Sequence, residues 1–257
     1  MKQVKKFITN KYLMFLYGTI AIFLIWQIAS IIVGSTVIPA PIDTIKLSIS
    51  YLGQAYTYEC LANSLFRMTL GFLIALLVAL FLGLLVNDNE KMYQFFMPIM
   101  TFFKSIPTAA LVFLFIVLLN AKNAPILVVV LIAIPILYES VVGGLKNTPE
   151  DVKDSADVDG ASKLKRLLRI QFPIAIPYII VGMISTFSLS FKIEIMAEVI
   201  TGYTKNGIGS LIKGAQIADA TDLAPVFAYS LIAVVLMLII TFMSFVITQQ
   251  IKKQNKN

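Results

Sequence analysis

The chain has 257 residues, of which 58% are hydrophobic and only 14% are charged, and its formal net charge is +7. A soluble globular domain carries about 25% charged residues, so an ordinary soluble fold is excluded. Histidine is absent and Cys60 is the single cysteine, which excludes an internal disulfide framework and removes imidazole ligands and bases.

Apolar runs long enough to cross a bilayer recur along the chain, and a spanning helix needs roughly 20 predominantly apolar residues. The first run, residues 12–33, is longer than the apolar core of a signal peptide, so we expect it to be a retained span. Five further runs predict spans at residues 62–86, 93–119, 125–142, 174–195 and 223–247. The sequence therefore predicts an all-α, polytopic membrane protein with six transmembrane helices.

Three segments depart from a simple pattern of spans. The third run contains Pro98 and Pro107, so we expect it to be kinked or to begin as an interfacial segment. Residues 42–51 have helical periodicity and are typical of an interfacial helix. Residues 201–222 contain four glycines and predict loose backbone, which must be buried in protein or exposed to water because it cannot face lipid.

The distribution of basic residues predicts the orientation. If the N-terminus is cytoplasmic, the four inside segments carry four, one, six and three Lys or Arg residues, fourteen in all, against four outside. Cytoplasmic loops carry the excess of Lys and Arg in membrane proteins. We therefore expect both termini to be cytoplasmic, and the basic charge requires no nucleic acid partner.

The polar loop at residues 143–172 has the most informative local pattern. Thr148 is a suitable N-cap and Pro149 suits the first position of a helix. Gly160 can end that helix by adopting a positive φ. A second helix is expected at residues 161–171. The loop therefore predicts two short helices with a sharp corner at Gly160, projecting into the cytoplasm.

This loop resembles the EAA motif of permease subunits in binding-protein-dependent ATP-binding-cassette importers. That motif reads Glu-Ala-Ala, three residues, Gly, nine residues, then Ile-x-Leu-Pro. The spacing here matches without a gap, although Asp replaces Glu and Ser replaces Ala in the triplet and Phe172 replaces Leu. The residues that the resemblance assigns to the ATPase contact are Asp154, Ser155, Ala156, Asp157, Gly160, Ala161, Ile170 and Pro173.

Other segments resemble the nitrate/sulfonate/taurine-type permeases. Ser105-Ile106-Pro107 resembles their third-span Ile-Pro signature, and Phe191-Lys192 stands where they usually have Trp-Lys. The resemblance covers most of the chain from residue 38 onward. Its other positions are Ser64, Arg67, Gly71, Phe72, Ala75, Gly83, Glu194, Ala197, Glu198, Gly207, Ile208, Gly209, Leu211 and Ile212.

The resemblance implies a type I ATP-binding-cassette importer permease in a prokaryotic inner membrane. Two permease copies, expected as a homodimer, would form the pathway for a small organic or anionic solute (nitrate, sulfonate, taurine or a vitamin precursor). Cytoplasmic ATPase subunits would dock on the coupling loop, and an extracytoplasmic substrate-binding protein would deliver the solute. ATP and magnesium are expected on the ATPase, while no cofactor or metal is expected in this chain.

The implied organisation has three parts. Residues 1–61 would hold the N-terminal tail, the first span and the outer interfacial segment. Residues 62–247 would form a permease core of five spans with the coupling loop at residues 143–172, and residues 248–257 would form a basic cytoplasmic tail.

Charged residues in or beside the spans are candidates for a solute pathway or gate. Glu194 and Glu198 share a helix face and repel each other unless a cation or water intervenes, while Lys192 lies on another side. Arg67 could instead snorkel from the outer end of its span, and Glu139 is interpreted as structural. The pathway candidates are Arg67, Lys104, Lys192, Glu194 and Glu198.

Two other function classes are weighed against this one. An intramembrane enzyme is disfavoured, because the chain lacks histidine, a Gly-x-Ser-x-Gly or His-Glu-x-x-His motif and paired aspartates in its apolar spans. A stand-alone secondary transporter or channel is the alternative. A secondary transporter needs its own site for a coupling ion, and the predicted spans contain few acidic residues that could form one. No P-loop motif occurs, so ATP hydrolysis would require another chain.

Overall fold

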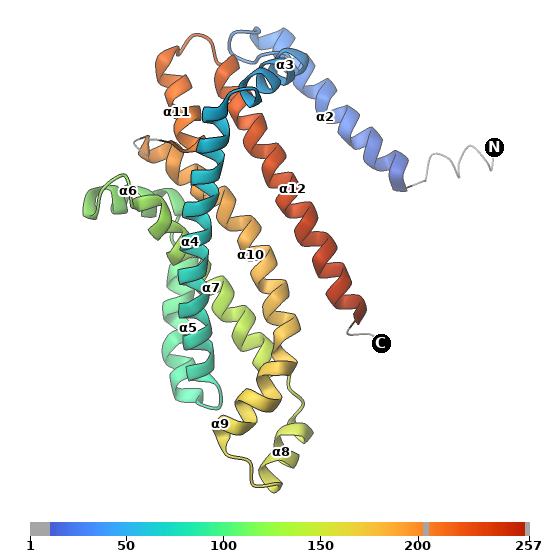
Figure 1. Ribbon diagram of the computed structural model, residues 1–257, viewed down its shortest axis with the longest axis vertical. Coiled ribbons are helices and arrows are strands. Elements are labelled where there is room, and N and C mark those ends of the chain that lie inside the picture. The colour runs from blue at the N-terminus through green and yellow to red at the C-terminus, as the bar shows by residue number, and fades with distance from the viewer. Residues whose placement is uncertain (1–10, 203–205, 255–257) are drawn as a thin grey trace, which may run out of the picture. The chain divides into compact units, whose positions relative to one another are not determined.

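The computed structural model describes residues 11–202 and 206–254, and every regular element among them is helical (Figure 1). The predicted all-α fold is confirmed. The elements are α2 (Lys11–Val33), α3 (Pro41–Leu52), α4 (Ala55–Val86), α5 (Glu90–Ser105), α6 (Thr108–Leu118), α7 (Ala124–Lys146), α8 (Glu150–Val158), α9 (Lys163–Arg166), a π-helical turn (Leu167–Gln171), α10 (Phe172–Thr201), α11 (Ile208–Ala218) and α12 (Ala224–Gln254).

Within the described residues, five helices have the length and apolar character of membrane spans. They are α2, α4, α7, α10 and α12, and they correspond to five of the six predicted spans. The helices extend beyond the predicted limits, because apolar character fades before the backbone hydrogen bonding ends. In particular, α12 continues through Gln254, so much of the predicted tail is helical.

The remaining predicted span consists of two helices. α5 and α6 are bent by 94° at Ile106 and Pro107. Together they have the length and apolar character of a membrane span, either one broken span or a re-entrant loop. Ile106 is extended, with ψ 127°, which is the conformation that a following proline favours. Pro107 also lacks the N–H that a continuous helix would use. The predicted interruption is confirmed, and it is a sharp corner.

The chain divides into two compact units, Met1–Tyr58 with Leu211–Val234, and Glu59–Ser210 with Val235–Asn257. In the first unit, Trp26 Nε1 of α2 donates to the carbonyl of Pro39 (3.0 Å), which lies just before α3. The Ser48 hydroxyl on α3 donates to the Ala228 carbonyl of α12 (3.1 Å). The predicted helix at residues 42–51 is confirmed as α3.

The second unit is built around the packing of α7 on α10. Small residues allow this close approach, as in other membrane helix pairs. At Gly182 of α10 an added Cβ would collide with the side chain of Ser140 on α7, and at Gly83 of α4 it would lie 2.5 Å from a methyl group of Val141. The buried residues Leu137 and Val142 of α7 also pack in the core between α4 and α5. These contacts fix the helices that carry the candidate sites.

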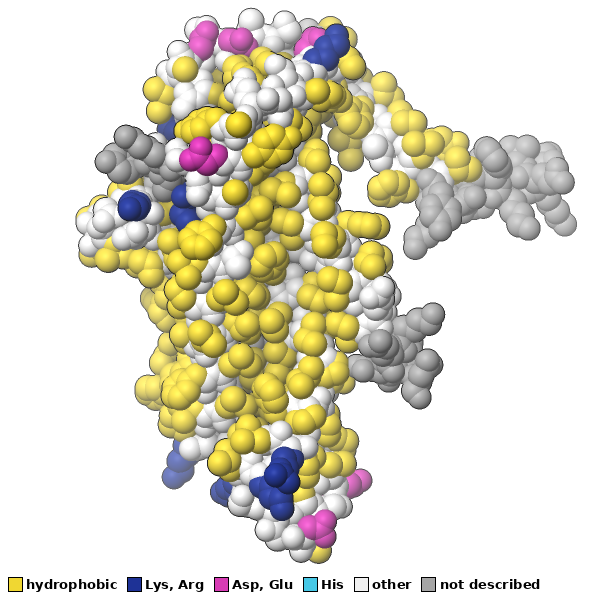
Figure 2. Space-filling view, viewed as in Figure 1, with side chains coloured by type: hydrophobic (Ala, Val, Ile, Leu, Met, Phe, Trp, Pro, Cys, Tyr) yellow, Lys and Arg dark blue, Asp and Glu magenta, His cyan; other side chains and the backbone are white. Residues whose placement is uncertain are grey.

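The surface of the second unit differs between its flanks and its loop end. On the face shown in Figure 2, hydrophobic side chains predominate along the middle and lower part of α4, while Lys and Arg side chains gather near α8 and α9. Exposed apolar side chains on α4 include Phe66, Leu77 and Phe81. This distribution is expected where helices face lipid and the loop end faces water.

Candidate functional site

The 143–172 loop folds into α8, a corner at Gly160 and a second helical segment, as the sequence predicts. That second segment is not a separate short helix, because it continues through the π-helical turn into α10. At the end of α8 the N–H of Gly160 donates to the Asp157 carbonyl (3.0 Å) and the N–H of Ala161 to the Ala156 carbonyl (3.0 Å). This pair of bonds is the Schellman arrangement, which requires a residue with positive φ at the corner. Gly160 supplies it with φ +72°. The predicted corner is confirmed.

The start of α8 differs from the prediction. Thr148 does not act as its N-cap, since the helix begins at Glu150 and Pro149 occupies the preceding position with an extended ψ of 141°. The Pro149 carbonyl accepts the first helical bonds, so the Thr148 hydroxyl is left buried without a hydrogen-bond partner. On the other side of the corner, the Ser162 hydroxyl caps α9 by accepting an N–H of its first turn (3.3 Å).

A buried arginine fastens this loop to the rest of the second unit. The Arg166 guanidinium forms ion pairs with Asp88 at the α4–α5 turn (2.7 Å) and with Asp157 on α8. Beside it, the Asn87 amide donates to Gln171 Oε1 (2.7 Å). In the sequence Arg166 belongs to a basic segment and Asp88 is 78 residues away, so no local pattern pairs them. Sequence reasoning therefore missed this contact.

The residues assigned to an ATPase contact occupy different positions on the loop. Asp154 and Ser155 are exposed on α8, whereas Ala156 is buried beneath them. Ile170 is half-buried in the π-helical turn, and Pro173 is exposed at the start of α10. The outward-facing members are accessible to a partner, and the inward-facing ones set the shape of the loop.

The loop also exposes large apolar side chains. Val158, at the end of α8, is 87% exposed, and Leu164 on α9 and Leu168 in the π-helical turn are exposed as well. An apolar side chain at a polar, water-facing tip is unusual, and grouped exposed apolar residues mark interaction sites. The tip of α8 is thus the best candidate for a partner contact on this loop.

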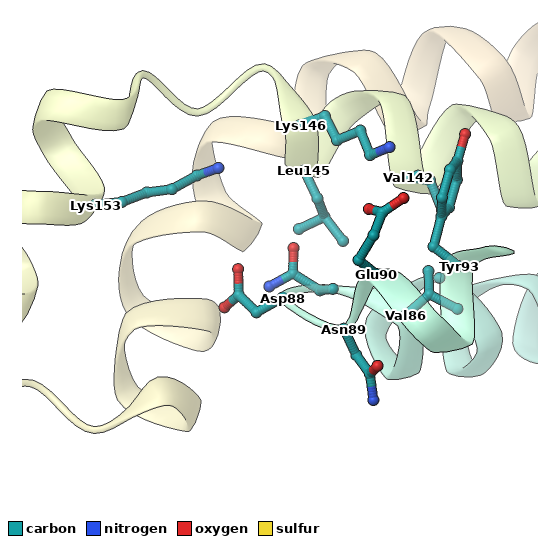
Figure 3. Close-up of a pocket in the computed structure, with 11 residues that line it drawn as sticks. Val86, Asp88, Asn89, Glu90, Tyr93, Val142, Leu145, Lys146 and Lys153 are labelled. Carbon is teal, nitrogen blue, oxygen red and sulfur yellow. The ribbon is translucent and has the colours of Figure 1, made fainter.

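A hollow of about 230 Å³ lies next to the α4–α5 turn, between that turn, the C-terminal end of α7 and Lys153 of α8. Figure 3 shows Lys146 of α7, Glu90 of α5 and Lys153 of α8 extending toward it from three elements. The Lys146 ammonium also lies 3.5 Å from the centre of the Tyr93 ring. The lining carries both signs of charge, so it favours no single class of ion.

A buried ion cluster joins α4 to α10 near the C-terminal end of α10. Arg67 Nε donates to Glu194 Oε1 (3.2 Å), and Arg67 Nη2 donates to Glu198. The Ser64 hydroxyl also donates to Glu198 (2.8 Å). Both carboxylates are fully buried. The two glutamates share a face as predicted and Arg67 is the intervening cation, so the interpretation of Arg67 as a snorkelling residue is wrong.

The first turn of α11 is built on this cluster. The Ser64 hydroxyl accepts the Ile208 N–H (3.0 Å), and Glu198 Oε2 accepts the Gly209 N–H (2.9 Å). A Cβ on Gly209 would lie 2.5 Å from the Cβ of Glu198. The glycine therefore serves close packing, and the loose backbone predicted for residues 201–222 is wrong over the length of α11.

The other two pathway candidates do not join the buried cluster. Lys104 of α5 pairs with Glu139 of α7 (2.7 Å), and their side chains are 42% and 54% exposed. Lys192 is exposed on α10. The five candidates thus separate into a buried cluster, an exposed pair and a surface lysine. In the described part of the chain, no three His, Cys, Asp or Glu side chains are placed to hold a metal ion.

The span pattern, the α8–Gly160 corner and the buried helix contacts together agree with one family. Residues 71–253 match the family described as "Binding-protein-dependent transport system inner membrane component". The chain belongs to this family. It is accordingly a multi-pass membrane protein, and the matched segment includes the loop, the Lys104–Glu139 pair and both glutamates of the buried cluster.

Relatives within this family agree with the predicted resemblance. The chain is 32% identical over 154 residues to the nitrate import permease protein NrtB of Leptolyngbya laminosa, which covers 59% of this chain and 54% of that protein. It is 29% identical over 199 residues to the bicarbonate transport system permease protein CmpB of Synechococcus elongatus, covering 72% and 70%. The chain thus spans about half the length of the NrtB relative.

Solved structures share the fold. A chain of the MetNI methionine ABC transporter in inward-facing form has a TM-score of 0.60 at 20% identity, covering 76% of this chain and 93% of that one. A chain of an amino acid ABC transporter with histidines has a TM-score of 0.66 at 14% identity, covering 80% and 98%. The predicted importer permease fold is confirmed.

Proposed function

We propose that this chain is the membrane-spanning permease subunit of an ATP-binding-cassette importer. In this proposal it forms a solute pathway and couples it to a separate ATPase through α8 and the Gly160 corner. The observation that carries the proposal is the α8 projection itself. It is a short helix whose last turn is held by Arg166 through Asp157, and it ends in a glycine turn at Gly160. A rigid element of this kind can transmit a rigid-body motion between subunits.

The outward surface of the projection suits a docking partner. Asp154 and Ser155 are exposed along α8, and Val158 exposes an apolar side chain at its end. An apolar anchor surrounded by polar groups is the usual composition of a protein interface. The residues proposed to face the ATPase, or to hold the facing residues in place, are Asp154, Ser155, Ala156, Asp157, Gly160, Ala161, Ile170 and Pro173.

The remaining partners follow from the same proposal. Cytoplasmic ATPase subunits would bind ATP and magnesium and hydrolyse ATP, since this chain has no P-loop motif. A second copy of the permease would complete the pathway, and an extracytoplasmic binding protein would deliver the solute. Both termini would be cytoplasmic, which puts the 143–172 loop on the side of the ATPase.

The solute is proposed to be a small anion. The two relatives described above are named for nitrate and bicarbonate, which are both small oxyanions. A further relative, from Pelagibacter ubique, is named for trimethylamine N-oxide and is 24% identical over 138 residues. The proposal therefore extends to small polar organic solutes.

Co-purification tests the proposal. The tagged chain would be expressed with the cell's ATPase subunits, extracted in detergent, and compared with a Gly160→Pro variant. Proline is held near a φ of about −65° and cannot adopt the positive φ of this corner. Gly18→Ala, at a glycine with open space around it on α2, is the control.

An ATPase recovered with wild type and with Gly18→Ala, and lost with Gly160→Pro at equal yield of the permease, supports the coupling proposal. If well-folded wild type brings down no ATPase, the importer proposal fails and a stand-alone transporter becomes the better interpretation.

A further inference from the structure

One face of α5 carries an exposed polar stripe. Gln94, Thr101 and Lys104 are exposed and follow Glu90 at intervals of four, seven and three residues, which places them on one side of the helix. Met97, also exposed, completes the same row. Beside this row, Met100 is buried against the core of the second unit. The polar row of α5 thus runs along the border between the packed side of the helix and its exposed side.

A matching stripe lies on α7. Glu139, Gly143 and Lys146 are exposed at intervals of four and three residues, whereas their neighbours in the sequence are mostly buried. The two stripes adjoin, because Lys104 pairs with Glu139 (2.7 Å). A hollow of about 230 Å³ between the two helices is lined by Thr101, Glu139, Gly143 and Lys146 among others. The two stripes therefore form one continuous polar face.

The position of this face along the helices conflicts with contact to lipid. At a rise of about 1.5 Å per residue, Thr101 lies about 16 Å from Glu90, and Glu139 lies about 10 Å from Lys146 at the end of α7. The hydrocarbon core is about 30 Å thick. The short Glu139 side chain cannot reach from that depth to the interface, and charged groups inside a membrane face water or protein.

An exposed row on α4 provides the comparison. Phe66, Leu70, Leu73, Leu77 and Phe81 follow one another at intervals of four, three, four and four residues, and all are exposed. The spacing resembles that on α5, but every side chain is apolar. A face of this composition suits lipid, whereas the face of α5 does not.

From this contrast we propose that the α5–α7 polar face lines the water-filled solute path, with the Lys104–Glu139 pair as its charged constriction. This inference rests on the proposed permease function. A small anion passing the constriction would compete with Glu139 for the Lys104 ammonium. Once the anion had passed, the Lys104–Glu139 ion pair would form again. The pair would thus favour anions over uncharged solutes of the same size.

Cysteine accessibility tests the inference with pairs of positions at equal depth. Gln94→Cys and Thr101→Cys lie on the polar face, while Phe95→Cys and Phe102→Cys lie one residue further on, and both phenylalanines are exposed. Wild type gives the baseline, because its cysteine, Cys60, is buried. Membranes containing the full chain with its co-expressed ATPase would be permeabilised, so that a charged, membrane-impermeant thiol reagent reaches both faces of the membrane.

If the polar face lines a water-filled path, Gln94→Cys and Thr101→Cys should react with the thiol reagent at least about tenfold faster than Phe95→Cys and Phe102→Cys. The reason is that only a cysteine in contact with water ionises to the reactive thiolate. Equal rates within each pair, or faster reaction at the phenylalanine positions, would overturn the inference. Co-purification of the ATPase is scored on the same membranes. An ATPase that is recovered while the polar face is unreactive rejects the path alone, whereas loss of the ATPase rejects the proposed function.

Discussion

Two ion clusters of the second unit each pair a basic side chain with glutamate, but they lie in opposite surroundings. Arg67 holds Glu194 and Glu198, both fully buried, whereas Lys104 and Glu139 are 42% and 54% exposed. Removing one partner of a buried pair costs about 3–5 kcal/mol, while an exposed pair contributes about 0–1 kcal/mol. A charge inside a span therefore does not by itself mark a pathway. The buried cluster builds the fold, and the exposed pair is placed to meet solute.

The largest effect is expected from Arg67→Met. This change removes the cation and leaves two buried carboxylates on α10, so the free energy of unfolding should fall by about 3–5 kcal/mol. Thermal unfolding of the purified protein in detergent measures it. Lys104→Met, at the exposed pair, is the matched control, and an equal loss of stability in the two variants would remove the distinction between the clusters.

Within the buried cluster the two glutamates should differ. Glu198 accepts hydrogen bonds from Arg67, Ser64 and the Gly209 N–H, whereas Glu194 is bonded through one oxygen only and its Oε2 has no partner. Glu198→Gln should therefore destabilise the protein by about 1–2 kcal/mol more than Glu194→Gln. Unfolding of the two variants under identical conditions measures the difference, and the reverse order would contradict the described bonding.

An intermediate effect is expected at Arg166, whose side chain is 9% exposed. Arg166→Met leaves Asp88 without its cation, which should cost about 1–3 kcal/mol. Because Arg166 also holds α8, hydrogen exchange at residues 150–162 should become faster than in wild type. Arg169→Met, an exposed arginine of the same loop, is the control and should leave that exchange unchanged. Similar exchange in both variants would mean that Arg166 does not position the loop.

The smallest effect on stability is expected from Lys104→Gln, because water solvates both members of the exposed pair. The free energy of unfolding should change by less than about 1 kcal/mol. Uptake of nitrate by membranes that also contain the ATPase and binding protein should nevertheless fall. A stable variant with unchanged uptake would show that the pair lies outside the solute path.

Much of this fold was accessible from sequence because membrane spans are set by runs of apolar residues. The corner at Gly160 was accessible too, since positive φ favours glycine and the capping bonds are local. The pairings of Arg67 with Glu198 and of Arg166 with Asp88 were not, because each joins residues that are far apart in the chain. Tertiary packing decides such contacts, and a single sequence carries no signal for them.

The 201–222 segment illustrates the same limit. Its glycines suggested loose backbone, yet Gly209 is required by the close approach of α11 to Glu198. The polar row on α5 was present in the sequence as a spacing of three and four residues. Its meaning depended on knowing which side of α5 packs against α7, and that required the structure.

The central claim, that α8 meets an ATPase, is tested most directly by photo-crosslinking from Val158. A photoreactive residue replacing Val158 at the end of α8 would be compared with one replacing Phe113, which is exposed on α6. In membranes containing both proteins, Val158 should form a covalent adduct with the ATPase subunit and Phe113 should not. An ATPase that co-purifies but forms no adduct at Val158, or forms one equally at Phe113, would contradict the account.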